Sequence, residues 1–337
     1  MNKEVLVIGG GPAGLEAVKQ LKNLGYKAYL VEKSDKLGGH LTKWDRLFPE
    51  GISAKETLEK LLKPIAGIKV FLNSEVVEVK RTDDLFTVTL SDKTTFIVSS
   101  IIVATGFTLF RAEKKEEYGY GIYNRVITNA DLENYFIKRS DNRINNPSKI
   151  GFVHCVGSRD EKVCNRQCSK LCCVTAVKQA CEVKELFPLS EVYCFYMDLR
   201  MYGRYYEDLY LEAQSKYGIR FIRGRVSEVA ENEDGKLVVK AEDTLSSKPL
   251  KISLDLLVLM AGMVKNDDNE SLSNILGTRI GEDGFFEPAN PILRSTEGNS
   301  MGIYFAGAST GPKTLPESIN EAKASVLAMH NYLSNRV

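Results

Sequence analysis

The feature that most constrains the fold is a glycine motif near the start of the chain, Gly9-x-Gly11-x-x-Gly14. It follows a short apolar strand pattern and opens a helical pattern that Gly25 ends, which is the order expected of a dinucleotide-binding unit. The first glycine allows a tight turn, the second lets backbone N-H groups approach a pyrophosphate, and the third lets helix and sheet pack closely. The motif therefore predicts a Rossmann-like fold.

An acidic residue occupies the position at which such a fold holds a ribose. A second predicted strand, residues 27-31, ends at Glu32, about twenty residues after the motif. A carboxylate there can bond both ribose hydroxyls, and it argues against the phosphorylated ribose of NADP. The alternative interpretation is a glycine-rich turn beside a solvated glutamate.

Further segments extend this pattern along the chain. A doublet at Gly38 and Gly39 permits close backbone packing on the same ligand, although a doublet can also be a simple turn. Residues 69-98 alternate in the manner of a small antiparallel sheet. Apolar strand patterns that end in small residues recur at 101-106, 256-262 and 303-307.

We therefore predict an α/β fold of the flavoprotein class with two dinucleotide-binding domains. The second domain is inserted into the first and is a degenerate nucleotide-binding-like domain, because residues 150-262 contain no second G-x-G-x-x-G motif. The expected boundaries are 1-110 and 290-337 for a discontinuous FAD-binding domain, 111-148 for an excursion and linker, and 149-289 for the second domain.

Five of the seven cysteines fall between positions 155 and 173. The first ends a buried-strand pattern, and the last two open a helical pattern over residues 174-186. Thiolates at a helix start are stabilised by the helix dipole, and Cys168 and Cys172, four positions apart, are expected to share a face.

Four convergent thiolates are what an iron-sulfur cubane needs. Structural zinc usually shows paired C-x2-4-C knuckles, which this spacing lacks, and a disulfide framework suits secreted chains. Zinc, and reactive or inert thiols, stay open as alternatives.

Charge and hydropathy exclude several classes of partner. The 45 basic and 44 acidic residues are well mixed and give a net charge of +1, so no nucleic-acid partner is expected. The longest apolar run, 254-264, contains Asp255 and is too short for direct membrane insertion. No signal peptide precedes the first strand pattern, so we expect a cytoplasmic protein, where clustered cysteines more often bind metal or do redox work than form disulfides.

The cysteine region also carries a family signature. The chain reads Cys155-Val-Gly-Ser-Arg-Asp160 and Cys168-Ser-Lys-Leu-Cys-Cys173, followed by Tyr196-Met-Asp198, Gly224-Arg-Val226, Gly284-Phe-Phe286 and Gly311-Pro-Lys-Thr-Leu-Pro-Glu-Ser318. Over about residues 4-334 it resembles the A subunit of heterodisulfide reductase. It looks like the short form found in the heterodisulfide-reductase-like complex of sulfur oxidisers, because longer members carry extra ferredoxin-type cysteine sets at both ends.

The resemblance implies FAD on the N-terminal fold and a [4Fe-4S] cluster beside it. It makes four cysteines the metal ligands, namely Cys155, Cys168, Cys172 and Cys173. Cys164 is left as an extra thiol, and Lys178 becomes the catalytic residue that faces the reactive edge of the flavin. Without the resemblance, a lysine on that helix face is expected to extend to water.

The motifs and the resemblance together predict the FAD-binding residues. These are Gly9, Gly11, Pro12, Ala13, Gly14, Glu32, Lys33, Gly39, His40, Ala104, Thr105, Gly106, Gly307, Ala308 and Pro316. Many two-dinucleotide flavoproteins have an acidic residue where this chain has Ala308, so the Gly307 backbone is expected to serve instead. Pro316 is predicted at the first position of a helix over 316-333, whose N-H groups can point at the flavin's pyrimidine oxygen.

The predicted function is electron transfer: FAD exchanges two electrons and passes them singly through the cluster, within a heterodisulfide-reductase-like complex of sulfur metabolism. B- and C-like subunits are the expected partners, and a homodimer is expected within the complex. One alternative is the flavoprotein of a quinone-interacting sulfate-reduction complex. Another is a stand-alone NADH-dependent flavin oxidoreductase of the disulfide reductase type, which needs a redox-active cysteine pair, usually C-x-x-C, and no such spacing occurs here. A flavin-free metal-bound assembly protein is the remaining alternative.

Overall fold

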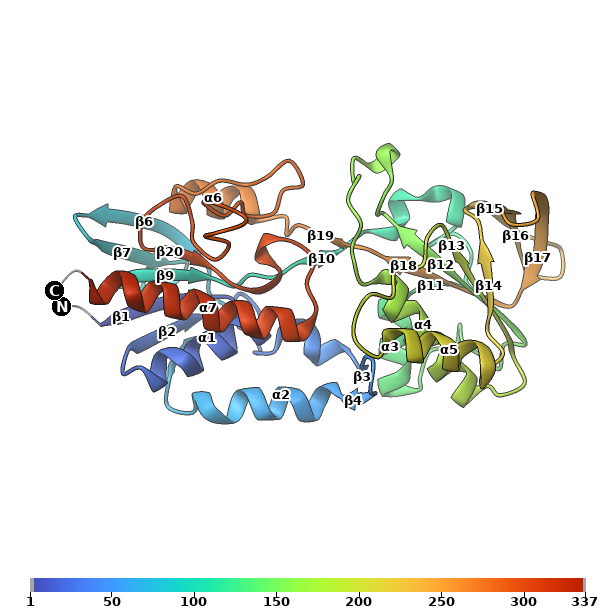
Figure 1. The fold of residues 1–337 in the computed structure, drawn as a ribbon, viewed down its shortest axis with the longest axis horizontal. Coiled ribbons are helices and arrows are strands. Elements are labelled where there is room, and N and C mark those ends of the chain that lie inside the picture. The colour runs from blue at the N-terminus through green and yellow to red at the C-terminus, as the bar shows by residue number, and fades with distance from the viewer. Residues whose placement is uncertain (1–2, 336–337) are drawn as a thin grey trace. The chain divides into compact units, whose positions relative to one another are not determined.

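The computed structural model describes residues 3-335, which form two compact units (Figure 1). The first unit contains Met1–Thr42, Ala54–Thr108 and Val264–Val337, and the second contains Lys43–Ser53 and Leu109–Met263. These divisions differ from the predicted boundaries in three places. Residues 43-53 and 111-148 pack within the second unit, and residues 264-289 pack within the first.

The first unit is built on a five-stranded parallel sheet in the order β20-β9-β1-β2-β5. Its strands are β1 (Glu4–Ile8), β2 (Lys27–Val31), β5 (Lys69–Phe71), β9 (Ser100–Val103) and β20 (Ile303–Phe305). The central strands are almost wholly buried, because helices cover one face and a second sheet with a helix covers the other. Continuous apolar runs such as Val5 to Ile8 are the sequence signature of this burial.

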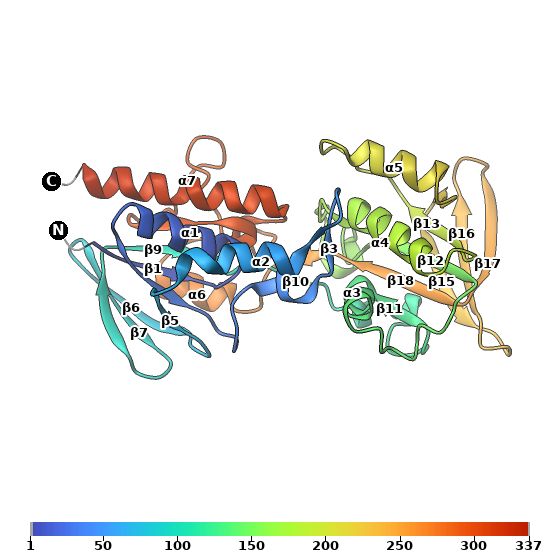
Figure 2. The same cartoon turned by 90° about the horizontal axis from the view of Figure 1, so that it is seen from below.

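Three helices and a small antiparallel sheet complete the first unit, together with the short helix α6 (Figures 1 and 2). Leu15 and Leu21 of one helix and Met329 of another pack on one face of the parallel sheet. Val88 of the small sheet and Leu272 pack on the other face. The elements are α1 (Pro12–Asn23), α2 (Ala54–Leu62), α6 (Asn269–Leu276), α7 (Leu315–Ser334), β6 (Val76–Thr82), β7 (Leu85–Leu90) and β8 (Thr95–Val98).

The second unit has its own five-stranded parallel sheet, in the order β11-β18-β12-β13-β14. The strands are β11 (Val126–Thr128), β12 (Lys149–Val156), β13 (Glu191–Tyr196), β14 (Arg220–Arg223) and β18 (Leu256–Ala261). Its helices are α3 (Asn129–Lys138), α4 (Cys172–Leu186) and α5 (Tyr206–Ser215). A three-stranded antiparallel sheet consists of β15 (Val226–Glu231), β16 (Leu237–Asp243) and β17 (Lys248–Leu254).

Short elements connect these layers. Two-residue strands pair as β3 (Arg46–Leu47) with β4 (Ile52–Ser53), and as β10 (Thr108–Leu109) with β19 (Met263–Val264). The 3-10 helices are η1 (Gly39–Lys43), η2 (Lys63–Ile65), η3 (Ala112–Lys114), η4 (Glu116–Tyr118), η5 (Glu161–Val163) and η6 (Gly307–Thr310).

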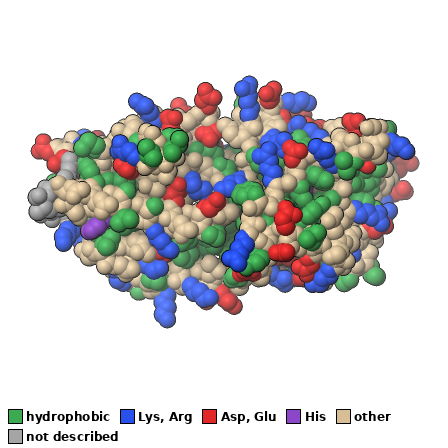
Figure 3. All heavy atoms as spheres, viewed as in Figure 1, with side chains coloured by type: hydrophobic (Ala, Val, Ile, Leu, Met, Phe, Trp, Pro, Cys, Tyr) green, Lys and Arg blue, Asp and Glu red, His purple; other side chains and the backbone are tan. Residues whose placement is uncertain are grey.

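The surface carries both signs of charge interspersed, as Figure 3 shows for one face. Within residues 3-335, no helix combines the length and the apolar character that crossing a bilayer requires. The longest helix, α7, spans twenty residues and includes Glu317, Glu321 and Lys323.

Candidate functional site

The glycine turn after β1 is packed tightly on its sheet side and is open on its outer side. Gly9 has a left-handed φ of 106°, and a Cβ added there would lie 2.4 Å from the Ala104 carbonyl oxygen. A Cβ on Gly14 would lie 1.9 Å from the Gly9 carbonyl oxygen. At Gly11, in contrast, no described atom beyond its two chain neighbours lies within 4 Å of an added Cβ. The turn is therefore open at Gly11, the position that a pyrophosphate would approach.

Glu32 lies at the end of β2 and is tied to this turn. Its Oε2 accepts a hydrogen bond from the Gly10 N-H at 2.6 Å, and its Oε1 accepts from the Ser34 N-H at 2.8 Å and from the Ser34 hydroxyl. The side chain is only 8% exposed. Since a carboxylate has about four lone-pair sites, these bonds leave acceptor capacity for a ribose hydroxyl.

The second glycine doublet packs directly against the first turn. The Gly38 N-H donates to the Gly10 carbonyl at 2.8 Å, and Gly39 adopts a left-handed φ of 53°. A Cβ on Gly39 would lie 3.2 Å from the Gly11 Cα. His40 follows in η1, where its ring stacks on Phe107 at a centroid distance of 4.2 Å. The backbone of 38-39 is thus held beside the open side of the motif.

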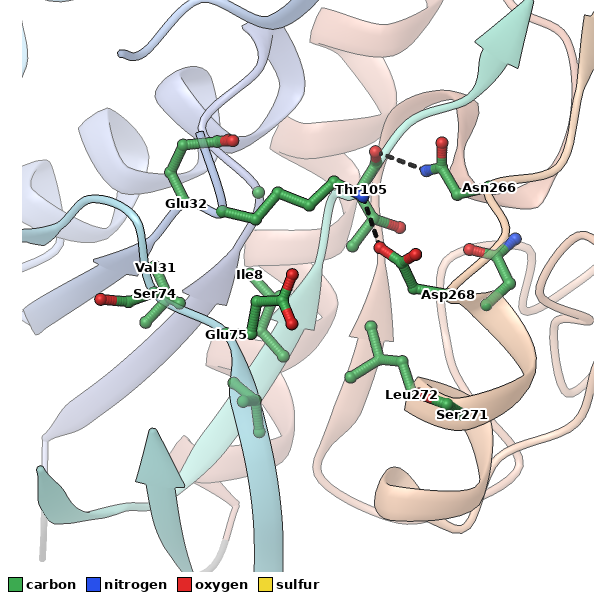
Figure 4. A pocket seen from close by; sticks show the side chains of 14 residues that line it. Ile8, Val31, Glu32, Ser74, Glu75, Thr105, Asn266, Asp268, Ser271 and Leu272 are labelled. Carbon is green, nitrogen blue, oxygen red and sulfur yellow. Dashed lines mark hydrogen bonds and ion pairs between the residues drawn. The ribbon is translucent and has the colours of Figure 1, made fainter. Parts of the chain in front are cut away.

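A cavity opens beside Glu32 within the first unit (Figure 4). Val31 and Ser74 line one side, and Asn266 and Asp268 line the other. The lining residue Lys33 forms an ion pair with Asp268.

Thr105 contributes an unsatisfied polar group to the same cavity. Its carbonyl accepts from the Asn266 amide at 2.9 Å, whereas its buried hydroxyl has no hydrogen-bond partner among the described residues. A buried hydroxyl without a partner is costly, so a polar ligand group would satisfy it. The cavity therefore suits a ligand that carries hydroxyl or phosphate groups.

The ends of the neighbouring strands complete this side of the first unit. The Ala104 N-H donates to the Ile8 carbonyl at 2.7 Å, and Gly106 has a left-handed φ of 73°. A Cβ on Gly307 would lie 2.6 Å from the Ala13 Cβ, which explains the glycine after β20. The following residue, Ala308, is buried.

Helix α7 begins one residue earlier than predicted, at Leu315, so Pro316 occupies the second helical position. The Thr314 hydroxyl caps the helix by accepting from the Glu317 N-H at 3.2 Å, and the Glu317 carboxylate accepts from the Thr314 N-H at 2.8 Å. This capping box already satisfies two backbone donors at the position where Pro316 was expected to expose them.

The cysteine segment of the second unit has an unusually strained backbone. Four non-glycine residues between positions 155 and 170 adopt left-handed φ values, namely Cys155 (59°), Arg159 (54°), Cys164 (55°) and Lys170 (64°). The pairing of β12 with β18 is irregular between Val153 and Val156, next to the first of them. Because such conformations cost energy, their clustering is typical of functional sites.

The four predicted ligands lie at one strand end, one loop and one helix start. Helix α4 begins at Cys172, so Cys168 precedes it and the expectation that these two share a helix face is wrong. Burial, together with smaller contributions from the charges of Cys173 and Cys168, raises the pKa of Cys155 to about 12. Burial likewise raises the pKa of Cys172, with contributions from the other three thiols. The four thiols therefore lie within electrostatic range of one another.

Backbone groups also surround these sulfur atoms. The Lys170 N-H donates to the Cys168 Sγ at 3.3 Å, and the Cys173 Sγ lies 3.6 Å from the Asp198 carbonyl oxygen. Within residues 3-335, however, no three His, Cys, Asp or Glu side chains are arranged to hold a metal ion. Cys164 is exposed.

Lys178 does not reach water, although the helical pattern alone predicted a solvated lysine. The side chain is buried in the second unit, and its Nζ lies 2.6 Å from the Glu133 Oε1 and 3.0 Å from the Glu182 Oε2. Burial raises the pKa of Glu182 to about 7, while Lys178 opposes this rise. Sequence reasoning missed both glutamates, although Lys178 and Glu182 have the four-residue spacing of a helical ion pair.

The segment 266-272 was also missed, because it was assigned to the second domain. Its Asn266, Asp268 and Leu272 line the cavity of the first unit. The available signal was the abrupt change after Gly262 from an apolar strand to the polar run Lys265-Asn-Asp-Asp-Asn269.

Comparisons with known proteins agree with this geometry. Residues 1-135, which include the glycine turn, match the family model of the pyridine nucleotide-disulphide oxidoreductases. This match indicates that the first part of the chain has a Rossmann-like dinucleotide-binding fold.

Several curated proteins are similar along nearly the whole chain. The iron-sulfur A subunit of the CoB--CoM heterodisulfide reductase of Methanocaldococcus jannaschii is 31% identical, over 98% of this chain and 64% of its own length. The first such A subunit of Methanopyrus kandleri is 31% identical, over 96% of this chain and 63% of its own length. The A subunit of the H(2)/formate:CoB-CoM heterodisulfide,ferredoxin reductase of Methanococcus maripaludis is 30% identical, over 98% and 64%. The chain thus spans less than two thirds of each relative.

Solved structures confirm the predicted fold class. Thioredoxin reductase of Lactococcus lactis superposes with a TM-score of 0.70 at 18% identity, covering 98% of this chain and 99% of that one. The T. acidophilum thioredoxin reductase gives a TM-score of 0.68 at 17% identity, with 99% and 100% covered. The chain therefore has the fold of thioredoxin reductase-like flavoproteins, and in sequence it is similar over nearly its whole length to the A subunits of heterodisulfide reductases.

Proposed function

We propose that this chain is an electron-transfer protein that binds FAD in its first unit and a [4Fe-4S] cluster in its second. The observation that carries the proposal is the presence in one chain of an open glycine turn beside a cavity and of four neighbouring cysteine thiols. A flavin exchanges electrons in pairs or singly and a cluster exchanges them singly, so together they can convert between the two modes.

The residues of the first unit fit FAD in two respects. The Gly11 side of the turn has room for a pyrophosphate, and the unpartnered Thr105 hydroxyl would gain a hydrogen-bond partner. Glu32 would accept from the ribose, and the remaining predicted contacts are retained in the proposal: Gly9, Pro12, Ala13, Gly14, Lys33, Gly39, His40, Ala104, Gly106, Gly307, Ala308 and Pro316.

The residues of the second unit fit an iron-sulfur cluster in their chemistry. Cys155, Cys168, Cys172 and Cys173 supply four thiols, and backbone N-H groups already contact two of the sulfur atoms, because Arg200 donates to Cys173 as Lys170 does to Cys168. Such N-H donors stabilise thiolate ligands. Binding would require the four side chains to converge further, since none of the described groups is yet arranged around a metal.

Lys178 is the proposed catalytic residue at the flavin, and its partners define what that role requires. Its ammonium group is shared between Glu133 and Glu182, so it would have to approach the flavin while one or both carboxylates balance its charge. Under the proposal, its cation stabilises negative charge that develops on the reduced flavin.

The proposed setting is a cytoplasmic complex with B- and C-like subunits that acts on sulfur compounds, with the chain present as a homodimer. Two features of the relatives support it: they are named as A subunits, and their names give a heterodisulfide as the compound acted on. The sulfur-oxidising type of complex is the specific version that we propose.

Rapid mixing with NADH tests whether the chain works within a complex or as a stand-alone reductase. We expect oxidised holoprotein mixed anaerobically with sub-millimolar NADH to keep its flavin absorbance for many seconds, because the second unit has no glycine turn for a nicotinamide cofactor's pyrophosphate. Addition of the B- and C-like subunits with their reductant should bleach it. Flavin bleaching within seconds by NADH alone would instead identify a pyridine-nucleotide dehydrogenase.

A further inference from the structure

We propose that Asn266 is a positioning residue for FAD, which fixes the backbone at Thr105 so that the Thr105 hydroxyl can bond a polar group of the cofactor. The inference rests on the proposed function, because it requires FAD in the cavity of the first unit. Asn266 lies outside the glycine motif, and neither that motif nor the family resemblance assigns it a role.

Asn266 lies on the segment by which the chain returns to the first unit, and it bridges two residues of the segment that precedes the crossing. Its Nδ2 donates to the Thr105 carbonyl at 2.9 Å (Figure 4), and its Oδ1 accepts from the Thr108 hydroxyl at 2.6 Å. These partners are 161 and 158 positions away in the sequence. Asn266 is only 7% exposed, so water competes little for either bond.

The chemistry of the two partners fixes the orientation of the amide. A backbone carbonyl can only accept, so the NH2 group faces Thr105 and leaves the amide oxygen to accept from Thr108. The bend between these partners contains Gly106, which has a left-handed φ of 73°. Because the Thr105 carbonyl belongs to the planar peptide group that joins residues 105 and 106, holding that oxygen also restricts the direction of the Thr105 side chain.

The segment that carries Asn266 is held independently of Thr105. The Asn269 N-H donates to the Asn266 carbonyl at 3.2 Å, where α6 begins. The Asn269 side-chain amide donates to the Gly284 carbonyl at 3.0 Å, and Asn269 is 1% exposed. Asn266 therefore extends its amide from a backbone that is already fixed.

Thr105 is the residue at which this arrangement meets the cavity. Thr105 and Asn266 both line it, and the buried Thr105 hydroxyl has no hydrogen-bond partner among residues 3-335. A buried hydroxyl that is left unpaired lowers the stability of the empty protein, and a ligand group that pairs with it recovers this loss on binding. Since a hydroxyl both donates and accepts, it can bond a hydroxyl or a phosphate oxygen of FAD.

A double-mutant cycle separates this indirect role from a direct contact between Asn266 and FAD. If Asn266 acts through Thr105, loss of the amide weakens FAD binding only while the Thr105 hydroxyl is present. The effects of two residues in one hydrogen-bond network are not additive, whereas independent contacts with the ligand add.

Ser273 provides a matched control in α6. Its hydroxyl donates to the Thr278 carbonyl at 2.8 Å, and the residue is 4% exposed, but it is not among the residues that line the cavity. Ser273→Ala therefore also removes a buried side-chain-to-backbone hydrogen bond. It should lower the thermal stability of the chain without changing its affinity for FAD.

The test is a titration of FAD into the flavin-depleted full-length chain, followed by flavin fluorescence, with the thermal unfolding of each variant measured in parallel. Thr105→Val and Asn266→Ala should each weaken FAD binding about tenfold, the effect of losing one good hydrogen bond. The double variant should bind FAD within about twofold of Thr105→Val alone. Thr105→Ser, which keeps the hydroxyl, should stay within about twofold of wild type.

A double variant that binds FAD about a hundredfold more weakly than wild type would show that the two effects add, and it would overturn the inference. Wild-type affinity in Asn266→Ala, or a loss of affinity in Ser273→Ala as large as in Asn266→Ala, would overturn it as well.

If Asn266→Ala does not fold, Thr108→Val decides, because it removes the hydroxyl that orients the amide. This variant should weaken FAD binding in the wild-type background but not in the Thr105→Val background, and an unchanged affinity in the wild-type background contradicts the inference. A wild-type chain that binds no FAD would instead refute the proposed function, and this result is distinguishable because it appears before any variant is compared.

Discussion

The Lys178 Nζ lies 2.6 Å from the Glu133 Oε1, and both side chains are buried in the second unit. Glu182 approaches the same ammonium group at 3.0 Å, so two carboxylates share one cation. A buried cluster with one excess negative charge is unfavourable, which is why burial raises the pKa of Glu182 to about 7. The arrangement makes stability depend on pH.

Glu182→Gln should change this pH dependence. The pKa of Glu182 is about 7 in the folded chain and 4.5 ordinarily. Between these two pH values, Glu182 is protonated in the folded chain and ionised in the unfolded chain. The folded state then binds more protons, so Glu182 lowers the free energy of unfolding as pH rises through this window, by about 3 kcal/mol in total. The free energy of unfolding of Glu182→Gln minus that of wild type should therefore be larger at pH 8 than at pH 5. Parallel denaturation profiles at the two pH values would contradict this.

Lys178→Met tests the proposed role of the lysine at the flavin. Loss of a cation near the flavin should lower its two-electron midpoint potential, because the reduced anion loses a stabilising charge. Lys178→Arg, which keeps the charge, is the matched control. The Met variant should also unfold about 3-5 kcal/mol more easily, since two buried carboxylates lose their partner. A variant that is destabilised but has an unchanged flavin potential would give Lys178 a purely structural role.

Two glycines separate cofactor binding from folding. Gly11 has an extended backbone with φ of -75° and open space around it, so Gly11→Ala should leave the thermal stability of the FAD-free protein unchanged. It should nevertheless weaken FAD binding by tenfold or more, about 1.4 kcal/mol, because the methyl group occupies the approach of the pyrophosphate. Gly14→Ala should instead destabilise the FAD-free protein by about 1-3 kcal/mol, since its Cβ would lie 1.9 Å from the Gly9 carbonyl oxygen. Equal FAD affinity in Gly11→Ala and wild type would refute the placement of the cofactor.

Serine substitutions distinguish the ligand cysteines from the extra one. Cys168→Ser and Cys172→Ser should each reduce the iron content well below the wild-type value, because the cluster loses a thiolate ligand. Cys164→Ser should retain wild-type iron, since that thiol is exposed and is not among the proposed ligands. Iron measured after anaerobic reconstitution checks both. If Cys164→Ser lost the iron while Cys168→Ser kept it, Cys164 would replace Cys168 in the set of proposed ligands.

The sequence predicted well those features that are encoded locally. The glycine turn, the buried strands β1, β12 and β18, and the alternation of β7 each depend on residues close together in the chain. The fold class and the similarity to heterodisulfide reductase A subunits are confirmed by the comparisons, whereas the closer resemblance to the short form of sulfur oxidisers stays a prediction. The placement of individual cofactor contacts remains a proposal.

Features that depend on distant partners were not predictable from the pattern. Residues 43-53 belong to the second unit, where the Asp45 N-H donates to Glu133 at 2.9 Å and Arg46 to Glu185 at 2.9 Å. Likewise, the chain returns to the first unit at Val264, shortly after β18 ends, and the polar run 265-269 that follows was not interpreted as a domain boundary. The burial of Lys178 depends on Glu133, a partner 45 positions away.

Native mass spectrometry of the anaerobically purified chain tests the central claim most directly, because it weighs the protein together with whatever it binds. We predict one FAD and one four-iron, four-sulfide cluster on each wild-type chain, and loss of the cluster mass but not the FAD mass in Cys172→Ser. A wild-type mass that corresponds to a single zinc ion, to FMN in place of FAD, or to no bound cofactor after reconstitution would contradict the account.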